Sequence, residues 1–203
     1  MERVAKASAW FGMAASVVAL LAFFGIENIE QLRQKLADAT GDETLEAYRA
    51  VNAGDCLHTW MTGQDTWATE VPKVVACGSE GAAVRVSRVT DTVGDCPSDG
   101  GRYHLSYTAE EGGTVVLCVT RRFETGQCIL SLPDGSANLM SWVACRGAVP
   151  APYSRTYIVT GVYAAPAEHE PGQCDRTRND GTAYASWFVD GDTVLVCAVV
   201  YTG

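Results

Sequence analysis

The eight cysteines are the residues of this chain with the clearest capacity for chemistry, and all of them follow residue 53. Zinc fingers and ribbons hold their ion with cysteines about two to four residues apart, because a short knuckle aims both sulfurs at one metal. No two cysteines here lie closer than Cys118 and Cys128, and the chain has no Cys-x-x-Cys redox pair. The spacing therefore predicts structural disulfides, with no metal site and no cofactor.

An internal repeat groups these cysteines into two modules. Four short motifs, each containing a cysteine, occur twice in the same order. The repeat predicts a first four-cysteine β module at residues 54–124 and a second at residues 125–203. The matching motifs are Gly54-Asp55-Cys56-Leu57 with Gly126-Gln127-Cys128-Ile129, Val75-Ala76-Cys77 with Val143-Ala144-Cys145, Gly94-Asp95-Cys96 with Gly172-Gln173-Cys174, and Gly113-Thr114-Val115-Val116-Leu117-Cys118 with Gly191-Asp192-Thr193-Val194-Leu195-Val196-Cys197.

The repeat also limits how the cysteines pair. If both modules use the same pairing, three arrangements are possible. We favour first with second and third with fourth, because each bond then closes a loop of about 18 to 24 residues, the length of two strands and their connection. Each such bond would contribute about 3 kcal/mol by the loop-entropy estimate. The expected disulfides are Cys56–Cys77, Cys96–Cys118, Cys128–Cys145 and Cys174–Cys197.

The three histidines, His58, His104 and His169, show no spacing typical of a catalytic or metal centre. The chain contains no Gly-x-Ser-x-Gly elbow, His-Glu-x-x-His pair, Walker loop or dinucleotide-binding fingerprint. No pair of carboxylates stands out by its spacing. The sequence therefore predicts a protein that is not an enzyme and has no catalytic residue. An unrecognised enzyme built from scattered residues is an alternative.

The aromatic residues supply the candidates for binding. In small β modules Trp and Tyr usually fill the core or cover a disulfide, whereas exposed rings suit a partner surface because they bury much area at little entropic cost. Trp60 and Trp67 lie in a polar connection between the first two cysteines, where we expect them to be exposed. With Tyr153, they are the candidate partner-binding residues. The proline-rich stretch at 148–171 is a further candidate surface loop.

The charge of the chain excludes several classes of partner. Residues after position 26 carry thirteen basic and twenty-three acidic side chains, a net charge of −10. Nucleic acids and anionic lipid surfaces require clustered Lys and Arg, so we expect no nucleic-acid partner. Neutral, cationic or apolar partners fit better, and a protein partner is the expectation.

An uncharged stretch, Ala7 to Ile26, precedes the modules. A helix of about twenty residues at about 1.5 Å per residue covers about 30 Å, the hydrocarbon thickness of a bilayer. A cleaved signal peptide is the alternative, but bulky rings stand where cleavage needs small residues. Because Arg3 and Lys6 precede the stretch, the positive-inside rule predicts a single-pass plasma-membrane protein with a cytoplasmic N-terminus and an extracytoplasmic C-terminus.

Residues 1–26 are thus expected to form a cytoplasmic stub and a signal anchor that is a transmembrane helix. Small residues in such a helix allow another helix to approach closely, so the anchor itself could pack within a membrane complex. The candidate transmembrane packing residues are Gly12, Ala15, Ser16 and Ala19.

Residues 27–53 are predicted to form a juxtamembrane helical stalk. Apolar residues recur three and four apart at 29–39, a narrow stripe that favours a helix resting on the domain and leaves open a homodimer through residues 27–39. Asp42 is an expected cap for a second short helix with Leu45, Tyr48 and Val51 on one side.

Beyond residue 53 the pattern changes to β-branched runs separated by Gly, Asp, Pro and Ser, with no comparable helical period. The fold class predicted for the exterior region is mainly β, as two small disulfide-bonded β modules on the single N-terminal transmembrane helix and its short helical segment. The expected strands are Val71–Ala76, Val84–Val89, Tyr103–Tyr107, Thr114–Val119, Tyr157–Val162, Tyr184–Val189 and Thr193–Tyr201.

The Gly-Asp-Cys opening at Cys56, the Val-Ala-Cys strand at Cys77 and the later cysteine pair resemble secreted modules of actinobacterial envelope proteins. LppU-type lipoproteins and the extracellular part of septum-formation-type membrane proteins are similar types. The chain differs from them in lacking a lipobox cysteine, and Cys77-Gly78-Ser79-Glu80 stands where septum-formation modules have Cys-x-x-Pro-His. The resemblance implies an envelope location and no catalytic residues.

Together these features predict a membrane-anchored, extracytoplasmic binding or assembly protein of the bacterial cell envelope. The alternative is a sensor or accessory subunit of a membrane complex that is recognised through its transmembrane helix.

Overall fold

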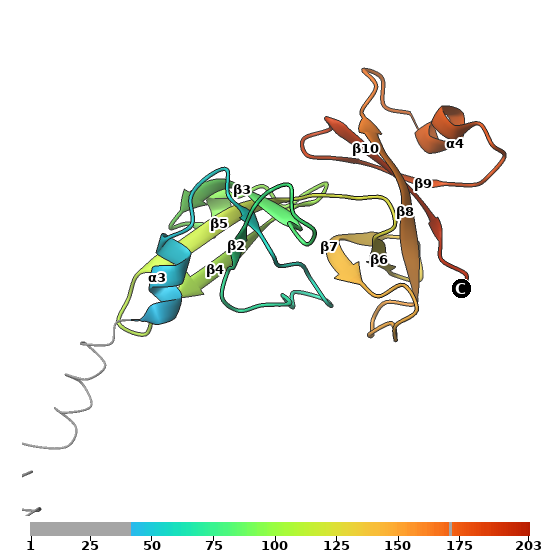
Figure 1. Ribbon diagram of the computed structural model, residues 1–203. Helices are drawn as coiled ribbons and strands as arrows, with labels where there is room; N and C mark the ends of the chain where they lie inside the picture. Colours follow the sequence, from blue (N-terminus) through green and yellow to red (C-terminus); the bar gives the residue numbers. More distant parts are fainter. Residues whose placement is uncertain (1–41, 171) are drawn as a thin grey trace, which may run out of the picture. The chain divides into compact units, whose positions relative to one another are not determined.

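The computed structural model describes residues 42–170 and 172–203 (Figure 1). Residues Thr44–Gly203 form one compact unit. The predicted anchor with its packing residues Gly12, Ala15, Ser16 and Ala19, and the predicted stalk helix at 27–39, lie outside the described residues. Within the described residues, no helix has both the length and the apolar character needed to cross a membrane.

Helix α3 (Glu43–Arg49) is the short helix expected after Asp42. Leu45 and Tyr48 are buried on one side of it, and Val51 is buried just beyond its end. The Tyr48 ring stacks on Tyr107, with 5.8 Å between the ring centroids. The three apolar residues lie on one side, as the sequence predicts, and that side packs against the first sheet.

The first module forms a five-stranded antiparallel sheet in the order β2-β1-β3-β5-β4. Both central strands, β3 and β5, are rich in Val, which suits a strand with a buried face. The strands are β1 (Cys56–Leu57), β2 (Val74–Val75), β3 (Val84–Thr90), β4 (Arg102–Thr108) and β5 (Thr114–Arg121). A short 3-10 helix, η1 (Val93–Asp95), precedes β4.

The second module repeats this arrangement, with the strand order β7-β6-β8-β10-β9 and antiparallel pairing throughout. A short helix, α4 (Gln173–Arg178), lies between β8 and β9. The strands are β6 (Cys128–Ser131), β7 (Ala137–Val143), β8 (Arg155–Ala164), β9 (Ala185–Val189) and β10 (Val194–Val200). Two curled sheets of the same topology thus follow one another along the chain.

The repeat extends to individual hydrogen bonds. The strand pairing of β3 with β5 shifts register next to Ser87, and that of β8 with β10 shifts next to Thr160. At both bulges the hydroxyl donates to the carbonyl of the module's last cysteine, Ser87 to Cys118 at 3.1 Å and Thr160 to Cys197 at 3.2 Å. The bulge recurs in both modules and is therefore a regular feature of this fold.

All four expected disulfides are present, which confirms the favoured pairing. The paired Cα atoms lie 5.1 to 5.5 Å apart, within the usual range. In the first module the second bond joins Cys96, which lies before β4, to Cys118 in β5. In the second module, the corresponding bond fastens α4 to β10 through Cys174 and Cys197.

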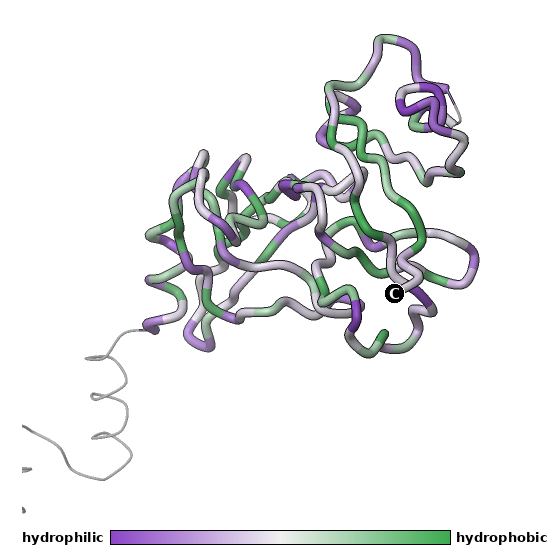
Figure 2. Tube along the Cα trace, turned by 45° about the vertical axis from the view of Figure 1, so that its right-hand side comes forward, coloured by the Kyte–Doolittle hydropathy of each residue, from purple (hydrophilic) through white to green (hydrophobic). Residues whose placement is uncertain are grey.

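The core follows the central strands of each sheet. Figure 2 shows hydrophobic residues in long runs along the strands, whereas α4 is mostly hydrophilic. The largest buried cluster combines α3 and the first sheet and also takes in Met140 of β7. A side chain of the second module therefore completes the core of the first.

Several elements were not predicted. Strands β1, β6 and β7 were missed because β1 and β6 are short and β7 mixes Asn, Met and Ser with few β-branched residues. Only Val74 and Val75 of the predicted 71–76 strand pair with a neighbour. Helix α4, six residues beside a disulfide, was also not predicted, because so short a helix shows no helical period in the sequence. Whether 54–124 and 125–203 are separate domains stays a prediction.

Candidate functional site

The connection after β1, residues 58–69, which we call the Trp60 loop, joins the two modules. The Met61 N–H donates to the Met140 carbonyl at 2.9 Å, and the Trp142 N–H donates back to the Met61 carbonyl at 3.1 Å. Met61 also bridges Trp67 within its own loop. The first module thereby adds a short strand-like segment to the edge of β7, which leaves fewer unpaired backbone groups on that edge.

Because neighbouring residues of an extended segment point to opposite sides, the Trp60 loop has two faces. Met61 points into the first core and is 3% exposed. Trp60 and Thr62, on the other side, line a groove of about 410 Å³ together with residues of the second module. We call it the Trp60 groove, and its lining is Trp60, Thr62, Trp142, Val143, Ala144, Gly147 and Ala148.

Two of the lining residues are tryptophans in contact, and His58 packs behind one of them. Trp60 lies against Trp142 with 4.8 Å between the ring centroids and 52° between the planes. His58 meets Trp60 edge to face at 5.0 Å, and its Nδ1 donates to the Gly81 carbonyl at 3.0 Å. The His58 bond fixes one ring edge, so the Trp60 side chain is held from both sides while staying half-buried.

Arg121 packs against Trp142, one of the two rings of the groove. Its guanidinium lies 5.5 Å from the ring centroids of both Trp142 and Phe123, in cation–π range. The same group is 3% exposed and donates to the carbonyls of Ala83 and Arg122, each at 2.6 Å, and to Gln127 Oε1 at 2.8 Å. Burial lowers the pKa of Arg121 to about 10, so it stays charged at neutral pH.

A second hollow of about 210 Å³ lies on the other face of the Trp60 loop. Tyr153 lines it and accepts a hydrogen bond from Asn138 Nδ2 at 2.9 Å. Tyr103 donates to Asp65 at 3.0 Å, and this bond, more than partial burial, raises the pKa of Tyr103. These bonds engage Tyr103, Asp65, Asn138 and Tyr153 with one another.

The structure therefore places all three candidate partner-binding residues around one loop. Trp60 lines the groove, and Tyr153 lines the second hollow. Trp67 packs against the first core and lies 6.4 Å from Tyr103 between ring centroids. The expectation that Trp60 and Trp67 are exposed was wrong, because Trp60 is half-buried against Trp142 of the second module and Trp67 is half-buried against the first core.

Arg121 was not a functional candidate, and Trp142, one of the aromatic residues considered, was not among the candidate partner-binding residues. Trp142 directly precedes the repeated Val143-Ala144-Cys145 motif, so its place beside a disulfide was readable, but its contact with Trp60 was not. That contact depends on the pairing of Met61 with β7, which joins segments about eighty residues apart in the chain.

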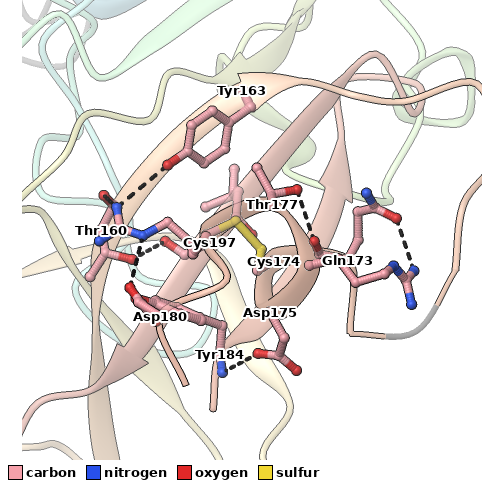
Figure 3. Close-up of a disulfide and its surroundings, with 12 residues drawn as sticks. Thr160, Tyr163, Gln173, Cys174, Asp175, Thr177, Asp180, Tyr184 and Cys197 are labelled. Carbon is pink, nitrogen blue, oxygen red and sulfur yellow. Dashed lines mark hydrogen bonds and ion pairs between the residues drawn. A yellow bond between two sulfur atoms is a disulfide. The ribbon is translucent and has the colours of Figure 1, made fainter. Parts of the chain in front are cut away.

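The longer second module carries its own polar network around α4 (Figure 3). Asp180 accepts from the Tyr184 hydroxyl at 2.6 Å, from the Thr182 N–H at 3.1 Å and from Arg178 Nε at 3.4 Å. The Tyr184 bond foremost lowers the pKa of Asp180 to about 2. Arg178 also donates to the Thr160 carbonyl at 3.3 Å. The side chains of Arg178, Asp180 and Tyr184 thus bond to one another or to the nearby backbone, which is typical of a structural network.

The remaining histidines are engaged by rings. His104 stacks on Tyr103 at 4.7 Å, and His169, in the proline-rich stretch, stacks on Phe188 at 4.0 Å. Within residues 42–170 and 172–203, no three His, Cys, Asp or Glu side chains come together as a metal site would require. The geometry offers a binding groove with aromatic walls.

No family model, curated protein or solved structure matches this chain. The resemblance to actinobacterial envelope modules therefore stays a prediction from the cysteine motifs.

Proposed function

We propose that this protein is a non-catalytic binding or assembly protein of the bacterial cell envelope that contacts a protein partner through the Trp60 groove. In this proposal residues 7–26 anchor it in the plasma membrane, with the N-terminus in the cytoplasm and the modules outside. The observation that carries the binding role is the half-buried Trp60–Trp142 pair, 4.8 Å apart, at the wall of an open groove.

The four disulfides support an extracytoplasmic location. Such bonds persist in oxidising compartments and are rare where glutathione and thioredoxin keep thiols reduced. All eight cysteines are paired. A cytoplasmic protein seldom has all of its cysteines in disulfides.

The composition of the groove supports a protein partner. Aromatic rings and small residues, here Ala144, Gly147 and Ala148, leave a shallow apolar surface on which a side chain or an extended peptide can lie. The rings are held in advance by His58 and Arg121, which reduces the entropy lost on binding. The acidic exterior favours a partner that is neutral or basic around its point of contact.

Two tryptophan substitutions test the proposal. Trp60→Ala should leave the fold intact and weaken capture of the partner about thirtyfold, which corresponds to about 2 kcal/mol for a hot-spot ring. Trp67→Ala is the matched control, because its ring packs on the core and its loss should lower the melting temperature. The measurement compares co-purification of the full-length variants from mild detergent with their circular dichroism melts.

Unchanged co-purification by a folded Trp60→Ala variant would refute the groove as the binding site. Replacing residues 7–26 by an unrelated transmembrane helix separates the alternative function. Loss of the partner after that exchange alone would identify an accessory subunit recognised through Gly12, Ala15, Ser16 and Ala19.

Topology is tested by fusing alkaline phosphatase after Gly203, since this reporter is active only outside the cytoplasm. The proposal expects an active fusion. Activity of a cytoplasmic reporter alone at the same position would reject the envelope location.

A further inference from the structure

A cavity of about 380 Å³ lies beside β3 and β5, separate from the Trp60 groove in all of its lining residues. Two parts of the first module contribute arginines to it: Arg85 comes from β3, Arg121 ends β5, and Arg122 directly follows that strand. Thr120 and the turn residue Asp190 also line it. Such a concentration of guanidinium groups is unexpected on a chain with a formal net charge of −9.

The sheet register places two of these arginines on one face. Arg85 pairs with Thr120 across β3 and β5, so their side chains point to the same side. Arg122 follows Thr120 by two residues and continues the pairing, because its N–H donates to the Ala83 carbonyl at 2.9 Å. Arg85 and Arg122 therefore flank the Thr120 hydroxyl on the face that the cavity opens to.

The hydrogen-bonding capacity of these two arginines is largely unused. In the described part of the chain, the Arg85 side chain has no hydrogen bond and no ion pair. Arg122 Nη1 only approaches the Cys56 sulfur, at 3.6 Å, and its Nε is buried without a partner. The Nη atoms of both guanidinium groups therefore keep donors that are available to an acceptor supplied by a ligand.

Arg121 contributes differently. Its Nη1 and Nη2 are already bound to the Ala83 and Arg122 carbonyls and to Gln127, while its Nε has no partner. The bond to the Arg122 carbonyl fixes the backbone that carries the neighbouring guanidinium. Arg121 thus adds positive charge behind the cavity and positions Arg122.

We propose that this cavity is a binding site for an oxyanion, the phosphate or carboxylate group of a ligand, held between the guanidinium groups of Arg85 and Arg122. A guanidinium presents parallel N–H donors that match the oxygens of either group. The Thr120 hydroxyl lies between them as a third donor. Asp190 is the one carboxylate in the lining, and it opposes the bound charge.

Four variants test the site by isothermal titration of the full chain in mild detergent, with inorganic phosphate and with acetate at constant ionic strength. The wild type should bind one anion per chain saturably. Arg85→Met and Arg122→Met should each weaken that binding about tenfold or more. Asp190→Asn should strengthen it, and Asn tolerates the left-handed backbone at this position, where φ is 52°.

Arg88→Met is the matched control, because Arg88 lies on the same strand and outside the cavity lining. It removes the same charge and should change affinity little. Arg85 is exposed, so its variant folds even if Arg122→Met does not. Tighter binding of phosphate indicates a phosphorylated ligand, and tighter binding of acetate indicates a carboxylate.

Absence of saturable binding of both anions would overturn the proposal. An equal loss in Arg88→Met and Arg85→Met would do so as well, because it would show attraction to overall charge without a site.

Discussion

Replacing Arg121 by Met tests whether this residue holds the junction of the two modules. The change keeps the length of the side chain and removes the guanidinium that bonds Ala83, Arg122 and Gln127 at 2.6, 2.6 and 2.8 Å. It also removes the cation beneath Trp142. Because Arg121 is 3% exposed, water cannot replace these bonds.

The size of the effect follows from the acceptors left behind. The Ala83 carbonyl keeps the Arg122 N–H, and Gln127 Oε1 keeps the Glu124 N–H, so neither is orphaned. A hydrogen bond to a charged group contributes about 1.5 to 3 kcal/mol, and relief of the buried charge offsets part of the loss. We expect a destabilisation of about 3 kcal/mol, or about 6 to 12 °C in a unit of this size.

Differential scanning calorimetry measures this shift. Arg49→Met is the control, because Arg49 pairs with Glu46 at 2.8 Å while both side chains are more than half exposed. Such a surface pair contributes under about 1 kcal/mol. A loss of 1 kcal/mol lowers the melting temperature of a unit of this size by at least about 2 °C. If Arg121→Met melts within about 2 °C of the wild type, the loss is below about 1 kcal/mol and the reasoning fails.

Two further changes address the second module and the His58 contact. Tyr184→Phe should raise the pKa of Asp180 from about 2 toward its ordinary value, since the Tyr184 hydroxyl is the main cause of the shift. A carboxyl whose pKa is lowered by folding stabilises the folded state at any pH above its pKa in the unfolded chain. That stability is lost as the pH falls from the unfolded pKa toward about 2, so Tyr184→Phe should unfold more readily than the wild type between these two pH values. Carboxyl NMR titration checks the pKa, and an unchanged value contradicts the assignment. Gly81→Ala should destabilise more than Gly112→Ala, because both have positive φ but only at Gly81 would a Cβ collide with the His58 ring. Equal melting temperatures would show that His58 yields freely.

Much of this fold can be predicted from the sequence because each motif of the internal repeat contains a cysteine. Matching motifs at Cys56 and Cys128, and at Cys118 and Cys197, restrict the pairings, and strand-length loops select among them. Long strands such as β5 and β10 can be predicted from their composition, because they are rich in Val.

The elements that the sequence does not reveal depend on contacts between distant segments. Strand β1 has two residues and exists because β2 and β3 pair on both of its sides. Helix α4 is six residues long, begins at a left-handed Gly172 and is fastened by Cys174, so tertiary contacts outweigh its weak propensity.

The candidate site shows the same division. Trp60 can be chosen from sequence as a ring in a polar connection, but the polar setting also suggested full exposure. The short pairing of Met61 with β7 brings Trp142 to 4.8 Å and half-buries both rings. Arg121 gave no signal, because a buried arginine at the end of a strand has no distinctive pattern.

In-cell photo-crosslinking from the Trp60 groove tests the central claim most directly. A photo-reactive amino acid at Thr62, which lines the groove, is compared with one at Glu110, an exposed turn residue between β4 and β5. The account predicts a discrete protein adduct from Thr62 that Trp60→Ala abolishes, with no such adduct from Glu110. Identical adducts from both positions, or none from Thr62, would contradict a partner bound in the groove.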